Sequence, residues 1–476
     1  MQNELFWDRK TELAHLKTIY GTKNAVFIKV YGRRRIGKTA LILRFLKTLP
    51  QGTYLYYYVD NAEDMVYYQT LSDAIERQLG DKTAITSWDD FFTYIAKKSH
   101  DRFVLVIDEA PRFMDTHSTF FTRLQHAWGT DPKLENSRIM LILVGSSIGM
   151  MDRMTNHHGP LYGRITHTLK LSPFRYVDFR EVFDKDSEHD TIQQYAVFGG
   201  TPHYVRIAYL DGKKLDEAIM ALIVKPQSIL SREADELFDI EGVREPARYA
   251  SILKAVAQGN LKLPEIANAT GIQMEQLPTY LNKLHERLDL VEPADPMGGK
   301  KKNARYDVRD NFFRFWFRFV FPHRSSIELG NTKDIHILIQ EQLPAFTGRV
   351  FARVVRELFT LYQGREMLGV PILFDEIGSW WPSKGAYTDT GDIDVVARHE
   401  KSRTTYIADV KYTREKYGFP EFNVLQTRIK NLPYGGQIII FVFSRSGFSS
   451  DFAQYAQEKR IMLVGLEQLS LLFDKA

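Results

Sequence analysis

The sequence predicts an α/β protein with an amino-terminal doubly wound parallel sheet, a helical connector and a second α/β domain. Three observations predict this order. Short apolar runs that end in glycine, serine or acidic residues alternate with helical segments over residues 1–230. Helical periodicity dominates residues 231–330, and alternation returns over residues 331–476. Alternating strands and helices are typical of sheets covered by helices, and a chain of 476 residues exceeds one hydrophobic core.

Composition excludes several classes of protein. Apolar residues make up 44% of the chain and charged residues 26%, which is ordinary for a globular protein. The absence of cysteine excludes disulfides and thiolate metal sites. No stretch approaches the roughly 18 uninterrupted apolar residues of a membrane span, and charges interrupt the amino terminus where a signal peptide would be apolar. We therefore expect a cytoplasmic protein. A net charge of +4 does not by itself indicate nucleic-acid binding.

A phosphate-binding motif follows the first apolar run. Gly32, Gly37, Lys38 and Thr39 match the Walker A pattern G-x-x-x-x-G-K-[ST], with a strand before it and a helix after it. Such a loop aims backbone N–H groups at phosphate oxygens, and the helix adds its dipole. Lys38 is expected to reach the β- and γ-phosphates and Thr39 to bind Mg²⁺. The motif predicts ATP and Mg²⁺ as cofactors.

An aromatic and basic turn precedes this loop. Phe6 and Arg9 stand just before an amphipathic helix and are candidates to pack beside an adenine ring. An ordinary surface turn explains them equally well.

Two acids end the apolar run that starts at Phe103. Asp108 is expected to hold Mg²⁺ through water, and Glu109 to orient or deprotonate the attacking water. A later apolar run leads to Ser146 and Ser147, either of which could sense the γ-phosphate. Carboxyl ends of parallel strands meet at one edge, so these groups are predicted to surround one nucleotide.

Two further loops are candidates to sense the nucleotide. Arg164 lies on a loop after the serine-containing run and could stabilise charge on a transferring phosphoryl group, in its own subunit or in a neighbour's. Pro202 belongs to the turn Phe198-Gly199-Gly200-Thr201-Pro202 before a helix. Either segment could also be an ordinary loop.

The connector has the layout of a winged helix-turn-helix. A helix over 263–270, a second over 276–287 and a hairpin over 291–306 follow one another. The second helix offers few side chains that read bases, so we expect no sequence-specific binding. Cations at the hairpin tip could neutralise DNA phosphates: Lys300, Lys301, Lys302 and Arg305. The aromatic block over 310–321 is predicted to pack between domains, with Arg314 and Arg318 at its polar edge.

Two predicted antiparallel strands in the carboxy-terminal region bring Asp394 and Asp409 together at one end. Period-2 alternation puts Asp409 and Lys411 on one face. Two carboxylates can hold a Mg²⁺ that polarises a phosphodiester, while a lysine positions water or stabilises the anionic transition state. Glu357 lies beside the apolar stripe of a helix predicted over 344–362, where an acid is unusual. An ion pair with Arg353 is the alternative.

Six segments of the first half resemble the STAND ATPases, an AAA+-like branch of signal-transduction NTPases: FWDRKTEL, YGRRRIGKTALI, VLVIDEAP, ILVGSSIGMM, PLYGR and FGGTP. This resemblance implies an ATP-driven switch that reports nucleotide state to an attached domain. About 110 residues of the last part resemble the PD-(D/E)xK restriction-endonuclease-like fold, including the nuclease-like domain that is fused to such ATPases. That resemblance implies Glu357, Asp394 and Asp409 as metal ligands and Lys411 as a catalytic residue.

Together these patterns predict an ATP-binding and ATP-hydrolysing switch coupled to a DNA-acting, Mg²⁺-dependent nuclease-like domain. DNA and a second copy of the chain are the expected partners besides ATP, with no membrane contact. The alternative is a regulatory ATP-binding protein whose carboxy-terminal domain is inactive and serves DNA binding or assembly. A transcription regulator would need a second helix richer in residues that read bases.

Overall fold

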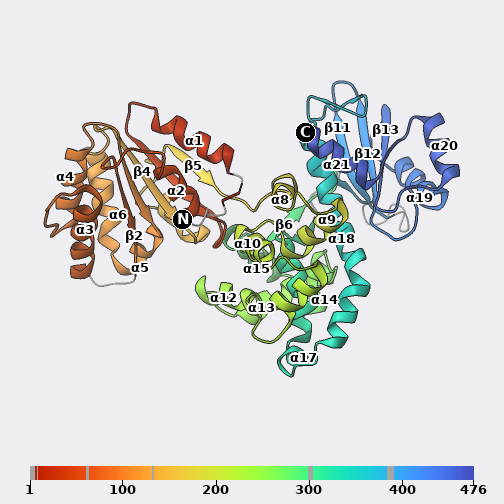
Figure 1. Cartoon of the computed structure of the whole chain (residues 1–476), viewed down its shortest axis with the longest axis horizontal. Helices are drawn as coiled ribbons and strands as arrows, with labels where there is room; N and C mark the ends of the chain where they lie inside the picture. Colours follow the sequence, from red (N-terminus) through yellow and green to blue (C-terminus); the bar gives the residue numbers. More distant parts are fainter. Residues whose placement is uncertain (1–5, 8, 61–63, 131–132, 299–303, 383–390) are drawn as a thin grey trace. The chain divides into compact units, whose positions relative to one another are not determined.

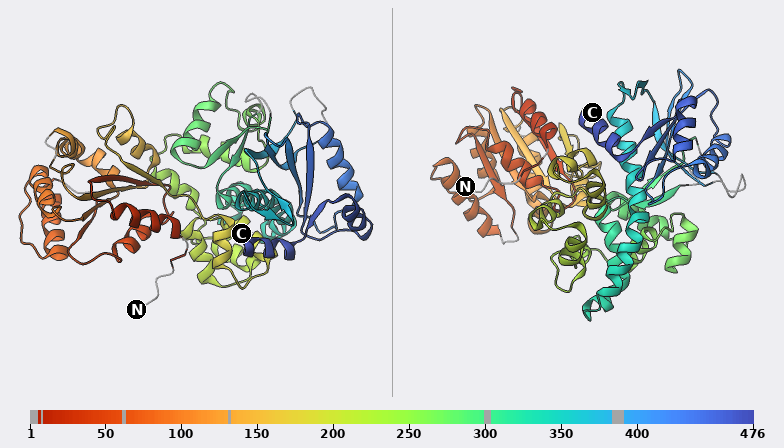
Figure 2. Two further views of the ribbon diagram at one scale, coloured as in Figure 1. Left: turned by 90° about the horizontal axis from the view of Figure 1, so that it is seen from above. Right: turned by 45° about the vertical axis from the view of Figure 1, so that its right-hand side comes forward.

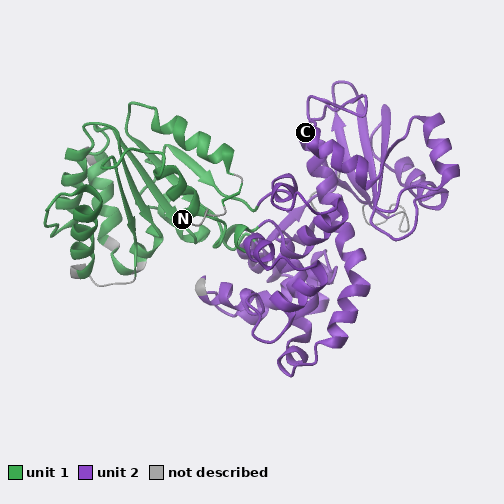
Figure 3. Cartoon of the chain, in the orientation of Figure 1, with its two compact units in different colours: residues 1–173, 201–203, 286–289 green, residues 174–200, 204–285, 290–476 purple. Residues whose placement is uncertain are grey.

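A computed structural model describes residues 6–7, 9–60, 64–130, 133–298, 304–382 and 391–476. The chain forms two compact units (Figure 3). Unit 1 contains residues 1–173, 201–203 and 286–289. Unit 2 contains residues 174–200, 204–285 and 290–476. Each unit is described by itself.

Unit 1 is built on a five-stranded sheet of order β2-β3-β4-β1-β5 in which every pair is parallel (Figure 1). The strands are β1 (Val26–Tyr31), β2 (Tyr54–Tyr58), β3 (Phe103–Asp108), β4 (Ile139–Gly145) and β5 (His167–Lys170). Strands β3 and β4 are buried along their whole length, as continuous apolar runs require in a sheet covered on both faces. This confirms the doubly wound parallel sheet.

Helices cover both faces of this sheet because adjacent strand residues point to opposite sides. Ile28 joins the core under α1 (Lys10–Tyr20) and α2 (Lys38–Leu46), whereas Phe27 joins the core of the other face. The remaining helical segments of unit 1 are α3 (Asp64–Leu79), α4 (Trp88–Lys98), η1 (Ala110–Arg112), α5 (Phe113–Thr116), α6 (Ser118–Gln125), η2 (His126–Thr130) and α7 (Ile148–Thr155).

The first part of unit 2 is mainly helical. Helix α10 (Pro202–Asp211) begins in unit 1 and continues in unit 2 from Tyr204. The hairpin of β6 (Val291–Ala294) and β7 (Arg305–Val308) follows two helices, in the predicted order. Lys300, Lys301 and Lys302 of its tip lie outside the described residues. The helical segments are α8 (Tyr176–Val182), α9 (Glu188–Phe198), α11 (Leu215–Ile219), η3 (Met220–Val224), α12 (Glu233–Ile240), α13 (Pro246–Ala257), α14 (Leu263–Thr270), α15 (Leu277–Asn282), η4 (Lys283–Arg287), α16 (Asn311–Phe315), η6 (Trp316–Val320), η7 (Phe321–His323) and α17 (Arg324–Glu328).

The second part of unit 2 is a mixed five-stranded sheet of order β10-β11-β12-β13-β14. The first two pairs are antiparallel and the last two are parallel. One core packs this sheet on α18 and α21, and another packs it on α19 and α20. The elements are α18 (Lys333–Leu361), β8 (Glu366–Met367), β9 (Val370–Pro371), β10 (Glu376–Trp380), β11 (Ile393–His399), β12 (Thr404–Lys411), α19 (Phe419–Lys430), β13 (Gln437–Ser444), α20 (Ser450–Lys459), β14 (Met462–Val464) and α21 (Leu466–Lys475).

Two predictions about this region need correction. Helix α18 begins at Lys333 and contains Pro344, so the proline does not mark its start. In Figure 2 the helix runs from the helical part of unit 2 to the mixed sheet. Arg314 is 1% exposed and lies inside the aromatic block, whereas Arg318 keeps partial exposure. Among the described residues, no helix combines the length and apolar character needed to cross a membrane.

Candidate functional site

The turn after β1 requires glycine at both ends. Gly32 has φ +153°, and a Cβ there would lie 2.5 Å from the Leu171 carbonyl oxygen. Gly37 has φ +86° and stands directly before α2. Only glycine adopts these conformations without strain. The backbone can therefore fold into the tight turn that cradles phosphate at a helix amino terminus.

The Lys38 side chain folds back onto this turn. Its Nζ donates to the carbonyl oxygens of Gly32 at 2.9 Å and Arg33 at 3.0 Å, and the residue is only 5% exposed. The loop thus fixes the ammonium charge beside the backbone that would surround a phosphate. Its contact with the β- and γ-phosphates stays a prediction.

The threonine of the loop and the acid of β3 meet directly. Thr39 Oγ1 donates to Asp108 Oδ2 at 2.8 Å, although β4 separates β1 from β3 in the sheet. The Tyr56 hydroxyl donates to the same Asp108 oxygen at 2.8 Å. Burial and the Asp108 charge raise the pKa of Tyr56, so the phenol stays a donor. Sequence reasoning missed Tyr56, because alternation within the run YLYYY singles out no tyrosine.

The adjacent acid is held in an uncommon backbone conformation. Glu109 has φ +54°, which costs a residue other than glycine about 1 kcal/mol or more and is a feature of functional sites. The Ser146 hydroxyl donates to Glu109 Oε1. Of the two serines considered, Ser146 is therefore placed to link β4 with this carboxylate.

The amino-terminal turn braces the phosphate loop. Arg9 is 5% exposed and donates to the carbonyl oxygens of Ile36 at 3.2 Å and Ser172 at 2.7 Å. Its guanidinium therefore binds backbone oxygens of the loop and of the segment after β5 instead of facing adenine. The predicted contact with adenine is corrected: Arg9 supports the phosphate loop. Phe6 packs against the core on the α2 side, and the Arg44 guanidinium lies 5.8 Å from its ring centre. A contact of Phe6 with adenine stays a prediction.

The turn at residues 201–203 lies against the same loop. Arg33 Nη2 donates to Thr201 Oγ1 at 2.9 Å. A Cβ at Gly37 would lie 3.7 Å from Pro202 Cγ, so the proline ring packs beside the loop glycine. Pro202 thus lies next to the phosphate loop, and its role in sensing the nucleotide stays a prediction.

Arg164 lies at the wrong end of the sheet for a nucleotide in its own subunit. Thr166 N donates to the Phe27 carbonyl oxygen at 2.8 Å, which puts the Arg164 loop beside the start of β1. The phosphate loop follows Tyr31, at the other end of the strand. Four residues of strand separate the two ends by about 13 Å. The prediction that Arg164 contacts the nucleotide of its own subunit is therefore wrong. A contact with a nucleotide held by a second copy of the chain stays a prediction.

A second acidic cluster lies on β11 and β12 of unit 2. The antiparallel register pairs Val395 with Ala408, so Asp394 stands opposite Asp409, as predicted. Asp394 Oδ2 accepts a bond from Val410 N at 3.0 Å. Asp409 Oδ2 accepts one from the Tyr417 hydroxyl at 2.7 Å.

The charges of this cluster are only partly compensated. Asp409 is 1% exposed, and its Oδ1 has no hydrogen-bond partner among the described residues; Lys411 Nζ lies 3.5 Å away. Burial and the Asp409 charge raise the pKa of Asp394 to about 6. A buried and a half-buried carboxylate, with one oxygen that accepts no hydrogen bond from the described residues, fit a hard divalent cation. Sequence reasoning missed Tyr417, because no motif ties it to Asp409.

Glu357 does not join this cluster. Its two carboxylate oxygens accept bonds from Tyr176 N at 2.9 Å and Val177 N at 2.8 Å, so it caps the start of α8. Burial raises its pKa to about 6. The alternative pairing with Arg353 is also wrong, because Arg353 bonds to Asp307 at 2.7 Å. No group of three or more histidine, aspartate or glutamate residues able to hold a metal occurs within the described part of the chain.

A neighbouring contact connects α18 to the acidic cluster. Arg356 Nη2 donates to Ser379 Oγ at 2.7 Å, and Ser379 Oγ donates to the Asp394 carbonyl oxygen at 2.7 Å. A residue of the helix thus supports the backbone of β11 at the position of the acid.

Arg305 is also engaged within unit 2. Its guanidinium bonds to both oxygens of Asp392 and lies 4.4 Å from the Trp381 ring centre. Met297, on the same hairpin, donates its N–H to the Ser379 carbonyl oxygen at 2.9 Å. The predicted use of Arg305 against DNA phosphates is corrected accordingly, since the side chain is already paired.

Comparisons with known proteins agree with this geometry. Residues 6–207 match an ATPase domain found predominantly in Archaea, and residues 316–420 match a domain of archaeal and bacterial proteins of unknown function. The chain is 31% identical over 414 residues to the uncharacterized protein MJECL04 of Methanocaldococcus jannaschii, covering 86% of this chain and 88% of that protein.

One solved structure supports the fold, and a second gives a lower score. The Walker-type ATPase PABY2304 of Pyrococcus abyssi superposes with a TM-score of 0.51 at 18% identity, over 66% of this chain and 97% of that one. The ORC2 protein of Aeropyrum pernix, in its ADPNP–ADP complexes, gives 0.44 at 16% identity, over 70% and 95%.

The parallel sheet, the phosphate loop and the Thr39–Asp108 contact define a P-loop ATPase. The extent of the match to the M. jannaschii protein places the chain more narrowly: it belongs to the same family as that protein. Its residues 6–207 carry the ATPase domain that occurs predominantly in Archaea.

Proposed function

We propose that the protein is an ATP-driven switch whose nucleotide site governs a Mg²⁺-dependent, DNA-acting nuclease-like domain. The contact that carries the switch is the one between the phosphate loop and the turn at residues 201–203. Helix α10 starts at Pro202, against Gly37, and continues into unit 2. A change in the loop on ATP binding or hydrolysis would therefore act on the first turn of a helix whose remainder belongs to the other unit.

The nucleotide-binding half of the proposal assigns one role to each residue. Lys38 and the loop amides bind the phosphates, and Thr39 and Asp108 hold Mg²⁺. Glu109 orients the attacking water. Ser146 holds the Glu109 carboxylate by a hydrogen bond and senses the γ-phosphate. The bound cation supplies neutralisation of the charge that develops on the phosphoryl oxygens.

The effector half rests on the Asp409 oxygen that accepts no hydrogen bond from the described residues, beside Asp394 and Lys411. Asp394 and Asp409 would hold the cation, which when bound polarises a phosphodiester. Lys411 would stabilise the anionic transition state. Tyr417 orients Asp409 through its hydroxyl.

The test is Mg²⁺-dependent nicking of supercoiled plasmid, with and without ATP. Asp409→Asn and Lys411→Ala should each lower the nicking rate at least about 100-fold while ATP hydrolysis is retained. Lys401→Ala, in the exposed turn between β11 and β12, is the matched control. Wild-type protein that fails to nick DNA with Mg²⁺ or Mn²⁺, with any nucleotide, would contradict the nuclease.

One observation favours the alternative of an inactive carboxy-terminal domain. Asp409 is 1% exposed, and Glu357 serves as a helix cap, so the cluster keeps two acids rather than three, and one of the two is buried. In that case unit 2 would serve DNA binding or assembly under the control of ATP. Nucleotide-dependent DNA binding that persists in Asp409→Asn, without cleavage by the wild type, would support this alternative.

A further inference from the structure

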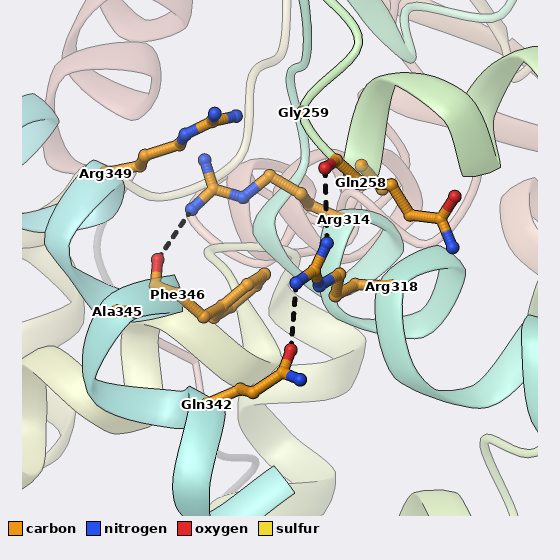
Figure 4. Close-up of a pocket in the computed structure, with 9 residues that line it drawn as sticks. Gln258, Gly259, Arg314, Arg318, Gln342, Ala345, Phe346 and Arg349 are labelled. Atoms are coloured by element: carbon orange, nitrogen blue, oxygen red, sulfur yellow. Dashed lines mark hydrogen bonds between the residues drawn. The ribbon is translucent and has the colours of Figure 1, made fainter. Parts of the chain in front are cut away.

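A pocket of about 360 Å³ lies in unit 2 (Figure 4), and neither Asp394 nor Asp409 is among the described residues that line it. Three segments surround it: the end of α13 with Gly259, the aromatic block with Arg314 and Arg318, and the middle of α18 with Phe346 and Arg349. Its lining contains three arginines and no carboxylate. The proposed nuclease and ATPase chemistry uses none of these residues.

The most buried of the arginines is also the least satisfied. Arg314 is 1% exposed, yet its Nε and Nη1 find no hydrogen-bond partner among the described residues, while Nη2 donates to the Phe346 carbonyl oxygen at 3.2 Å. Figure 4 shows this guanidinium beside the ring of Phe346, and the distance from Arg314 Cζ to the ring centre is 4.7 Å. Burying a cation with unused donors is costly unless an acceptor reaches it.

The nearest acid compensates this charge only in part. Asp307 Oδ2 lies 3.7 Å from Arg314 Nη1 but only 2.7 Å from Arg353 Nη2, which also pairs with Glu292 at 3.2 Å. Burial, with Arg353 and Arg349 as further cations, lowers the pKa of Arg314 to about 9 even though Asp307 opposes the change. Three cations, Arg314, Arg349 and Arg353, thus face two acids, Asp307 and Glu292, so the local balance of charge is positive.

The other two arginines are placed to extend the same surface. Arg318 donates to the Gln258 carbonyl oxygen at 3.2 Å and to Gln342 Oε1 at 2.8 Å, which holds its guanidinium at the pocket wall. Arg349 is exposed, and its Nη2 would lie 3.4 Å from a Cβ at Gly259. Glycine at 259 thus leaves room for that guanidinium at the rim.

We propose that this pocket binds a small phosphorylated molecule, with Arg314, Arg318 and Arg349 contacting its phosphate group. Guanidinium groups match the geometry of phosphate oxygens and donate two bonds at once. The volume falls at the lower end of the range for small-molecule sites, which suits a phosphomonoester better than a macromolecule. Phe346 and Ala345 offer apolar surface to the uncharged part of the ligand.

The experiment uses the full chain carrying Lys38→Ala, which removes nucleotide binding at the phosphate loop. Isothermal titration with inorganic phosphate and with AMP should each give saturable binding. Arg349→Gln and Arg318→Gln, added singly, should weaken it at least about tenfold, because a hydrogen bond to a charged group is lost. Lys430→Gln is the matched control, because Lys430 is an exposed cation at the end of α19, and it should leave binding unchanged.

Three results would overturn the proposal: no binding of either probe, binding that both arginine variants leave intact, or dependence on Arg349 seen only with a single-stranded oligonucleotide. The last result would assign the pocket to a nucleic-acid backbone. Arg349 is exposed, so its substitution leaves the fold intact, and far-UV circular dichroism verifies this. Since Lys38→Ala is present throughout, failure here is independent of any failure of the ATP-driven switch.

Discussion

The two acidic sites of the chain differ in how completely their side chains are paired. In unit 1, Asp108 receives bonds from Thr39 and Tyr56, and Glu109 receives one from Ser146. In unit 2, Asp409 keeps an unbonded buried oxygen. The contrast teaches that the nucleotide site is organised by its own side chains, whereas the second site has a carboxylate oxygen left for a group from outside.

The largest effect expected at the organised site follows from Lys38→Ala. Loss of the ammonium removes the cation that faces the phosphates, so ATP affinity should fall at least about 100-fold. Titration with a fluorescent ATP analogue measures it. Lys47→Ala, exposed at the end of α2, is the control. Tight binding by Lys38→Ala would refute the assignment of the phosphate loop.

The next effect separates binding from hydrolysis. Glu109→Gln should keep ATP affinity within a few-fold but lower the hydrolysis rate about 100-fold, because a general base contributes that much or more. Ser146→Ala should have a smaller effect in the same direction, since Glu109 loses its hydroxyl partner. Rates are measured as phosphate release at saturating ATP. An unchanged rate in Glu109→Gln would transfer the catalytic role to another residue.

The correction of Glu357 from metal ligand to helix cap gives a prediction about pH. Because its folded pKa is about 6 and its ordinary value is 4.5, the native state binds more protons between these values. Its contribution to the free energy of unfolding should therefore fall as pH rises from 4.5 through 6, by about 2 kcal/mol.

The measurement compares wild type with Glu357→Gln by urea unfolding from pH 4.5 to 7.5. The glutamine does not titrate, so the difference between the two proteins should change by that amount, with a constant offset for the altered cap. A difference that is flat with pH would show that Glu357 is not buried as a charged cap. Retained Mg²⁺-dependent nicking in this variant would agree with its exclusion from the acidic cluster.

The smallest expected effect concerns the turn at residues 201–203. Thr201→Val keeps the shape of the side chain but removes the acceptor of the Arg33 bond, which is worth about 1 kcal/mol. ATP affinity should change only a few-fold, measured by the same titration as for Lys38. Thr48→Val, at the end of α2, is the matched control. A change of 100-fold would make this turn part of the binding site itself.

The nucleotide site was predictable because its signals are local. Fixed spacing from Gly32 to Thr39 specifies a turn and a helix, and the buried run before Asp108 specifies a strand that ends at the same edge. The supporting contacts were not predictable, since Tyr56 and Arg9 meet the site only through the fold. Arg164 was misplaced for its own subunit because a loop after a strand in sequence can lie at either end of the sheet.

The second site was only partly predictable. Two strands joined by a short turn put Asp394 opposite Asp409, because antiparallel pairing follows from the turn. The position of Glu357 depends on where α8 packs, 181 residues earlier in the chain, and no local pattern carries that information. The same holds for Arg314: an arginine in an aromatic run looks like a boundary residue until the fold encloses it.

Helix α18 has 29 residues, which corresponds to a length of about 43 Å, and Pro344 lies within it. It presents Arg349 to the arginine pocket and, two turns later, Arg356 to Ser379 beneath Asp394. A small displacement of the helical segment that contains Arg349 and Arg356 would move both contacts. These two contacts lie about 10 Å apart along the helix axis. A substitution that shifts the packing of this part of the helix should therefore change both contacts together.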